Sequence, residues 1–319
     1  MKTSTVLGIV LAVLFSFAGV ATAAGYLWAQ ADSDHPPAAR ALPAQWPSNG
    51  GTALRPVPMP TGEMVTALPP DTAGQVLCQS LSLARWEALL GGKALREVRG
   101  ADCHIVTTTT DITLALDSGP ANLQEPRETE VAGHTAQLEY LPPKVSSRLD
   151  VRLADAPGSS QIKPYLRVEL RGDAPALDTL AESIASEVVA ATTKPGPALP
   201  PVRENGSIPL ERPAPTAIAD LPLPMISWQL CAALTRELGG TARPYIDGRC
   251  MVRGVQAAYT DTVSPRAFPL SLAGRPALIT DNLVAVRLTD GTSQELAFTG
   301  DRRSLEKIAR AVLPRLLGH

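Results

Sequence analysis

The side chains of this 319-residue chain that could do chemistry are four cysteines, four histidines and a few acidic pairs. No two cysteines form a C-x-x-C motif, and the cysteines lack histidines at metal-ligand spacing. We therefore expect disulfide bonds, and neither a metal site nor a cofactor. Three pairings are possible for the four residues, which are Cys78, Cys103, Cys231 and Cys250.

Catalytic motifs are absent from the sequence, since no nucleophile elbow, phosphate-binding loop, dinucleotide fingerprint or zinc-binding helix motif occurs. Asp111 with Asp117, and Asp261 with Asp281, could act as acid–base pairs. All four lie at predicted strand ends and turns, where aspartate commonly bonds to the local backbone. His134 would matter if it met carboxylates in a deep cleft. We expect that the protein is not an enzyme.

An internal repeat organises the chain. The plan that starts at Leu77-Cys78 recurs about 150 residues later at Leu230-Cys231. A repeated unit favours bonds within each copy, namely Cys78 to Cys103 and Cys231 to Cys250. Further matches follow in the same order in both copies: Gly91-Gly92 with Gly239-Gly240, Ala132-Gly133 with Ala273-Gly274, Asp150–Leu153 with Ala285–Leu288, and Gly172-Asp173 with Gly300-Asp301.

Each copy is predicted to contain a helix, several antiparallel strands and a second helix. The spacing of apolar residues in Gln75–Leu90 and Met225–Leu238 predicts the first helices. Asp173 and Asp301 are placed to open the last helices, with Asp173 as N-cap. The expected fold class is α+β: two tandem repeats, each an antiparallel sheet covered by an N-terminal and a C-terminal helix. Strands are predicted at Cys103–Val106, Ile112–Leu116, Glu130–Tyr140, Arg148–Leu153 and Pro164–Leu170, and at Cys250–Tyr259, Arg266–Leu272, Pro276–Thr280, Leu283–Leu288 and Gln294–Phe298.

The N-terminal apolar run, Val6–Trp28, is 23 residues long and can span a bilayer. Lys2 before it and acidic residues after it orient the following domains outside the cytoplasm. Ala21-Thr22-Ala23 leaves a second interpretation open, a cleaved secretion signal. The predicted divisions are a signal anchor at 1–31, a Pro-rich disordered stalk at 32–72, a first domain at 73–192, a Pro-rich linker at 193–223 and a second domain at 224–319.

Short motifs of the first copy resemble those of actinobacterial cell-envelope proteins, many of which are lipoproteins of unknown function with one Cys-paired domain. The resemblance covers about residues 74–191 and, more loosely, 225–318. This chain differs in being duplicated and in having no cysteine placed to accept a lipid. The resemblance implies an α+β fold and a location in the envelope, with no established activity. Its motifs are Leu77-Cys78, Trp86, Leu89–Gly91, Gly100–Cys103, Val131–Gly133 and Gly172-Asp173.

These observations predict a non-catalytic binding protein of the cell envelope, displayed outside the membrane. The net charge of −2 and the 4% aromatic content argue against a nucleic-acid partner. An envelope protein, a lipid or a wall polymer would be the partner. Two alternatives stay open, a sensor or accessory subunit of another membrane protein and a hydrolase that acts on wall polymer or lipid.

Overall fold

The computed structural model describes residues 51–141, 146–172, 176–212, 217–261, 266–288, 293–300 and 302–317. All of these residues belong to one unit of the chain, Leu42–His319. The predicted anchor Val6–Trp28 lies outside the described residues. Within the described ranges, no helix combines the length and the apolar character that a membrane crossing needs.

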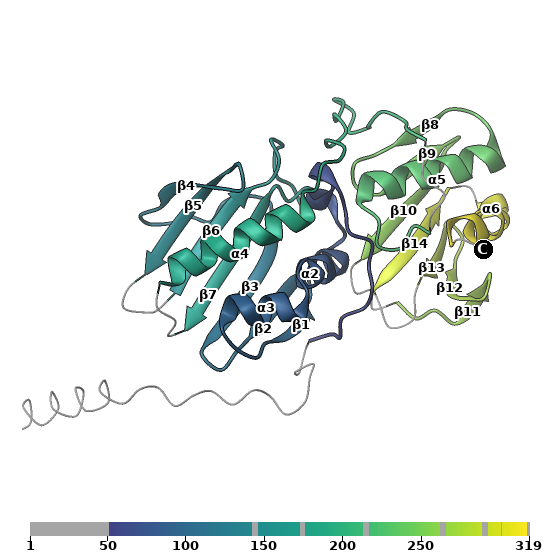
Figure 1. Ribbon diagram of the computed structural model, residues 1–319. Coiled ribbons are helices and arrows are strands. Elements are labelled where there is room, and N and C mark those ends of the chain that lie inside the picture. Colours follow the sequence, from purple (N-terminus) through teal and green to yellow (C-terminus); the bar gives the residue numbers. More distant parts are fainter. Residues whose placement is uncertain are drawn as a thin grey trace, which may run out of the picture. The chain divides into compact units, whose positions relative to one another are not determined.

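The described part of the chain is α+β and contains two antiparallel seven-stranded sheets (Figure 1). The elements around the first sheet are η1 (Gly62–Ala67), α2 (Pro70–Gln79), α3 (Leu83–Leu90), β1 (Leu95–Arg99), β2 (Asp102–Val106), β3 (Thr110–Asp117), β4 (Arg127–Val131), β5 (His134–Leu141), β6 (Ser146–Arg152), β7 (Tyr165–Gly172) and α4 (Leu177–Thr192). Those around the second sheet are α5 (Leu223–Leu238), β8 (Ala242–Pro244), β9 (Arg249–Val252), β10 (Val255–Asp261), β11 (Leu270–Leu272), β12 (Arg275–Ile279), β13 (Leu283–Arg287), β14 (Gln294–Thr299) and α6 (Arg302–Leu316).

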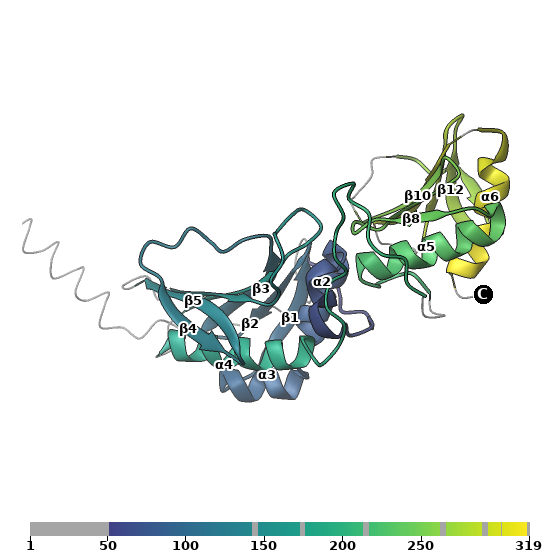
Figure 2. The ribbon, with the colours of Figure 1, turned by 90° about the horizontal axis from the view of Figure 1, so that it is seen from above.

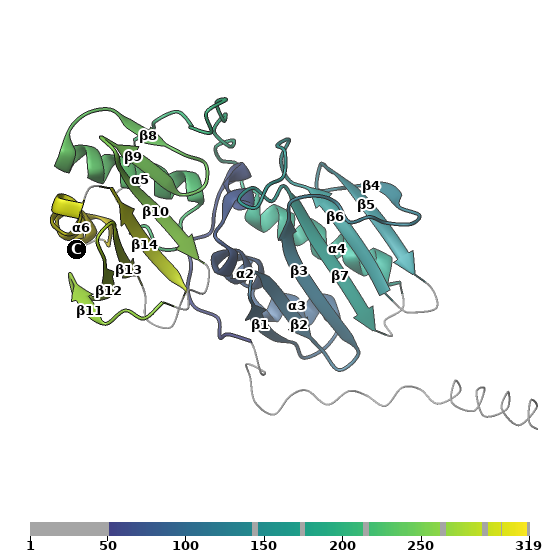
Figure 3. The same ribbon diagram turned by 180° about the vertical axis from the view of Figure 1, so that it is seen from behind.

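The strands follow the same order in both sheets. The first sheet runs β1-β2-β3-β7-β6-β5-β4, and the second, read from its own first strand, runs β8-β9-β10-β14-β13-β12-β11 (Figure 3). In each sheet the cysteine of the second strand faces the third strand, Cys103 opposite Leu114 of β3 and Cys250 opposite Ala257 of β10. In each sheet the last strand of the sequence therefore pairs with the third strand and closes the centre of the sheet.

The first core lies between the first sheet and its helices. Alternate residues of β3 are buried, as expected for a strand with one face against a core. Helix α2 contacts β1, β2 and β3, and α4 contacts β4 to β7. Figure 2 shows α3 and α4 together on one side of this sheet. In the second core, α5 contacts β8, β9 and β10, and α6 contacts β13 and β14.

The predicted helix Gln75–Leu90 is wrong as a single helix, because two helices occupy its place. Helix α2 begins earlier, at Pro70, and ends at Gln79, whereas α3 begins after Ser82. The Ser82 hydroxyl accepts a hydrogen bond from Arg85 N at 3.2 Å and so caps α3. The apolar spacing continues across the break, and it therefore concealed the change of helix direction.

Two predicted strands are hairpins. Glu130–Tyr140 runs from the end of β4 through most of β5, and Cys250–Tyr259 covers most of β9 and β10. Their turn residues, Ala132-Gly133 and Arg253-Gly254, all have positive φ angles, between 49° and 83°. A two-residue hairpin turn of this kind matches the twist of the flanking strands. The short edge strands β1 and β8 were not predicted at all, because neither shows a clear alternation of apolar residues.

The predicted start of α4 is also corrected. Asp173, the expected N-cap, lies outside the described residues, as does Asp301 before α6. The N-cap position of α4 belongs to Ala176, which has a φ of 57° and makes no side-chain capping bond. Helix α4 therefore begins without the aspartate cap that the sequence predicts.

Two segments predicted as spacers pack against the sheets, and we call them the first strap (residues 51–61) and the second strap (residues 206–212 and 217–221). Thr52 exchanges backbone hydrogen bonds with Val98 of the edge strand β1, at 2.7 and 3.2 Å. Ile208 N donates to the carbonyl of Pro244 on the edge strand β8 at 3.0 Å. Apolar residues in or beside the straps are buried, among them Val65 directly after the first strap and Ile208 and Ile218 in the second strap. Proline-rich composition excludes long helices, but it does not prevent single apolar residues from packing.

Candidate functional site

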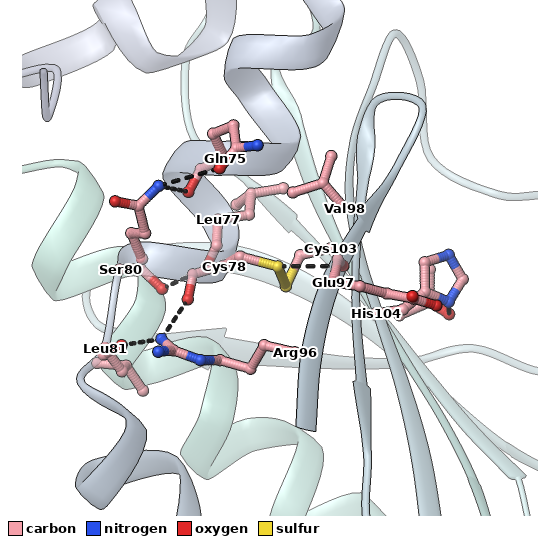
Figure 4. Close-up of a disulfide and its surroundings, with 12 residues drawn as sticks. Gln75, Leu77, Cys78, Ser80, Leu81, Arg96, Glu97, Val98, Cys103 and His104 are labelled. Carbon is pink, nitrogen blue, oxygen red and sulfur yellow. Dashed lines mark hydrogen bonds between the residues drawn. A yellow bond between two sulfur atoms is a disulfide. The ribbon is translucent and has the colours of Figure 1, made fainter. Parts of the chain in front are cut away.

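Both predicted disulfides are present. Cys78 on α2 bonds to Cys103 on β2, and Cys231 on α5 bonds to Cys250 on β9 (Figure 4 shows the first). All four residues are fully buried, and no cysteine is free. The Arg96 guanidinium donates to the carbonyl of Cys78 at 2.8 Å, so it satisfies the C-terminal end of α2 beside the bridge (Figure 4). These cysteines hold helices to strands and offer no thiol for chemistry.

Polar side chains from the two straps, one helix and two strands meet in a set that we call the polar junction. It brings together elements from the first sheet's half and from the second sheet's half of the unit Leu42–His319. Its members are Arg55 of the first strap, Asp71 and Thr72 of α2, Asp220 of the second strap, Asp261 of β10, and Ser293 and Gln294 at the start of β14.

Asp220 is the centre of the polar junction. Its carboxylate receives two bonds from the Arg55 guanidinium, at 2.5 and 2.7 Å. Thr72 Oγ1 and Gln294 Nε2 each donate to Asp220 Oδ1 at 2.8 Å. Burial alone would raise the pKa of Asp220, but the bonds from Arg55 and Thr72 outweigh it, and the pKa lies below its ordinary value. The carboxylate is therefore ionised at neutral pH.

The Arg55 guanidinium serves two carboxylates. Besides Asp220, it donates to Asp71 Oδ2 at 2.6 Å. Burial of Arg55 acts to lower its pKa, whereas the hydrogen bonds to Asp220 and Asp71 raise it above its ordinary value. One cation thus joins the first strap to α2 and to the second strap in a planar, bidentate geometry that lysine could not reproduce.

Asp261 occupies the other side of the polar junction. Its carboxylate accepts a hydrogen bond from Asp71 N in the first turn of α2 at 2.9 Å, and another from Ser293 Oγ at 2.7 Å. Burial raises the pKa of Asp261. Tyr259, two residues earlier on the same face of β10, has a buried hydroxyl without a hydrogen-bond partner among the described residues. Burial also raises the pKa of Tyr259.

The polar junction holds elements together rather than exposing reactive groups. Its carboxylates and its guanidinium are bonded to one another or to neutral donors from the chain. In the described ranges, no three His, Cys, Asp or Glu side chains converge to hold a metal ion.

The other predicted site residues are dispersed. Asp111 and Asp117 share one face of β3, where Asp117 pairs with Arg167 at 2.6 Å. Asp261 belongs to the polar junction, while Asp281 lies in the turn between β12 and β13. His134 begins β5, and its Nδ1 lies 2.9 Å from the backbone oxygen of Arg152. The structure therefore does not bring these residues together into one site.

The face of the first sheet that turns away from its core is covered with ion pairs, and we call it the outer face. Arg167 reaches Asp150 at 3.0 Å, and Arg148 and Arg171 both reach Glu169, at 3.4 and 2.7 Å. Burial of Glu169 acts to raise its pKa, but the two arginines lower it below its ordinary value. Around Glu169 the arginine is the more exposed partner, since Arg171 is 71% exposed and Glu169 is 20% exposed. In the Arg167–Asp117 pair the order is reversed, with Asp117 at 36% and Arg167 at 21%. The outer face therefore presents the guanidinium groups of Arg148 and Arg171 to solvent, beside the exposed Asp117 carboxylate.

Two hollows of the surface lack converging reactive groups. One, of about 420 Å³, lies between α4 and the β4–β5 hairpin, but its Glu182 pairs with Arg127 and its Glu187 pairs with Arg85. The other, of about 480 Å³, lies between α5 and the second strap and has Leu210 at its rim. Neither hollow has the geometry of a nucleophile beside a base.

Sequence reasoning missed the polar junction because Arg55, Asp71 and Asp220 lie in segments predicted to be spacers. The available signal was a Leu-Pro pair before each first helix, Leu68-Pro69 and Leu221-Pro222, which marks the true start of α2 and α5. Comparison with known proteins adds no assignment, because no protein-family model, no curated protein and no solved structure matches the chain.

Proposed function

We propose that the chain is a non-catalytic interaction protein of the cell envelope, exported and held to the membrane by Val6–Trp28. The envelope location agrees with the resemblance to actinobacterial envelope proteins. Two fully buried disulfides support an oxidising compartment, since such bonds persist outside the cytosol. The observation that carries the non-catalytic part is the pairing of ionisable side chains with one another, instead of their convergence on a hollow.

We also propose that the two halves are copies of one unit, each a sheet with an N-terminal and a C-terminal helix on its core. Identical strand order supports this, as do two glycines, Gly172 and Gly300, that end the seventh strand of each sheet or directly follow it with φ of 150° and 152°. Aligned by Gly91 and Gly239, the sequence places Cys78 five residues upstream of Cys231. Aligned instead by the Leu-Pro pairs before α2 and α5, the two cysteines coincide.

The outer face of the first sheet is the proposed contact surface, and its partner is an envelope component that presents carboxylate or phosphate groups. The exposed guanidinium groups on this face can donate bidentate hydrogen bonds to such anions. Because their own carboxylate partners are more buried, the arginines can bind a partner without leaving an unpaired buried charge. A partner's anionic groups would thus bind these arginines while the arginines keep their ion pairs with Glu169.

Binding assays with the full-length chain test this proposal. The chain is immobilised and offered the protein, lipid and wall-polymer fractions of an envelope extract separately. Arg171→Glu should abolish capture, whereas Arg310→Glu, on α6 and paired with Glu306, should leave it unchanged. Capture that survives Arg171→Glu contradicts the proposed surface. Turnover of a wall polymer or lipid by the purified chain contradicts the non-catalytic function.

A further inference from the structure

The charges of the polar junction do not balance. Three carboxylates, those of Asp71, Asp220 and Asp261, share one guanidinium, that of Arg55. Arg55 donates to Asp220 and to Asp71, whereas Asp261 accepts from the neutral donors Asp71 N and Ser293 Oγ. Asp261 is therefore the carboxylate of the set whose ionised form is least compensated.

The donors around Asp261 suit both of its protonation states. An ionised carboxylate accepts from the Ser293 hydroxyl and from Asp71 N, as observed. A hydroxyl can also accept, so a proton on Asp261 Oδ1 would be donated to Ser293 Oγ across the same 2.7 Å contact. Oδ2 would keep its bond from Asp71 N. Protonation removes a buried negative charge beside Asp71 and breaks no hydrogen bond.

Groups on each element around Asp261 favour or oppose its protonation. The Asp71 carboxylate on α2 repels the ionised form, whereas Arg55 on the first strap attracts it. Tyr259 on β10 is a neutral neighbour, and Asp220 on the second strap adds a further negative charge to the set. Burial is the largest influence and, with the Asp71 carboxylate, raises the pKa of Asp261. The hydrogen bonds from Ser293 and Asp71 N and the charge of Arg55 act to lower the pKa but do not outweigh burial.

We propose that Asp261 is a proton-linked latch between α2 and the second sheet, which tightens when Asp261 takes up a proton in mild acid and loosens when the proton leaves. The direction follows from linkage. A folded-state pKa above the unfolded value means that the folded chain binds the proton more tightly, so the latch gains stability as the pH falls through this range. The Asp220–Arg55 pair behaves in the opposite way, because the pKa of Asp220 is lowered. Its contribution is complete above the ordinary value of 3.8 and is lost only in stronger acid.

Amide hydrogen exchange of the full-length chain tests the latch, with Asp71 N–H as the probe. Exchange rates at each pH are divided by the intrinsic chemical rate to give a protection factor. We expect the protection factor of Asp71 N–H to rise as the pH is lowered from neutral to mild acid. The largest possible rise equals the ratio of the acid dissociation constants of Asp261 in the open and the closed latch. Asp261→Asn keeps an acceptor for Asp71 N and cannot titrate, so its protection factor should not change over this range. Asp155→Asn, at a loop side chain that is 94% exposed, should behave as the wild type.

A protection factor for Asp71 that is independent of pH in the wild type overturns the proposal. The same pH dependence in Asp261→Asn also overturns it, because another group would then be responsible. If Asp261→Asn fails to fold, the carboxyl carbon of Asp261 is titrated by NMR in the wild-type chain. A midpoint above 3.8 supports the latch, and a midpoint at or below 3.8 overturns it.

Discussion

Replacing Arg55 with methionine should be the most damaging single change in the polar junction, because it removes one guanidinium and leaves two carboxylates behind. The substitution keeps most of the aliphatic stem and deletes three charge-assisted hydrogen bonds, two to Asp220 and one to Asp71. Breaking a buried pair by removing one partner costs about 3–5 kcal/mol. The Arg55 side chain is 29% exposed and Asp220 keeps its bonds from Thr72 and Gln294, so water and these donors reduce the loss to about 2–3 kcal/mol.

The free energy of unfolding of Arg55→Met, measured by denaturant titration under non-reducing conditions, checks this value. A thermal scan should show a midpoint lower by roughly 4–10 °C. Arg310→Met is the matched control, since Arg310 and Glu306 form an exposed ion pair at 59% and 51% exposure and its loss should cost about 0.5 kcal/mol or less. If Arg55→Met costs no more than Arg310→Met, the polar junction does not stabilise the fold as argued. A double-mutant cycle with Asp220→Asn should show that the two substitutions are not additive.

Three further variants test one disulfide bond and two glycines. Replacing Cys231 and Cys250 by alanine opens a bridge between residues 19 apart, so the free energy of unfolding should fall by about 3 kcal/mol in non-reducing denaturation; unchanged stability would contradict the entropic role of the bridge. Gly172→Ala should cost about 2–4 kcal/mol in the same assay, because φ is 150° and a Cβ would lie 2.1 Å from the Thr109 carbonyl oxygen. Gly133→Ala, at a positive φ in open space, should cost only about 1 kcal/mol, and equal losses at the two sites would refute the steric argument.

Local patterns predicted the strands well where side chains alternate, and the alternation in Ile112–Leu116 placed β3. The turn at Ala132-Gly133 was missed inside the predicted strand Glu130–Tyr140, although both residues have positive φ angles in the β4–β5 hairpin. The helix break at Ser80–Ser82 was missed, because an apolar stripe reports which residues are buried and not whether the axis is continuous. The edge strands β1 and β8 are too short to carry a period, and backbone bonds to the straps support them.

The sequence by itself determined the cysteine pairing, the α+β class and the approximate strand positions, because short-range periodicity and the recurrence of short motifs around the cysteines indicate them. The tertiary structure alone decided the straps and the polar junction. Arg55 and Asp220 are 165 residues apart, and neither lies in a periodic element, so nothing local marks them as partners. Their meeting depends on how two proline-rich segments pass over the sheets. That path follows from the packing of isolated apolar residues and from backbone bonds to edge strands, which leave no periodic trace in the sequence.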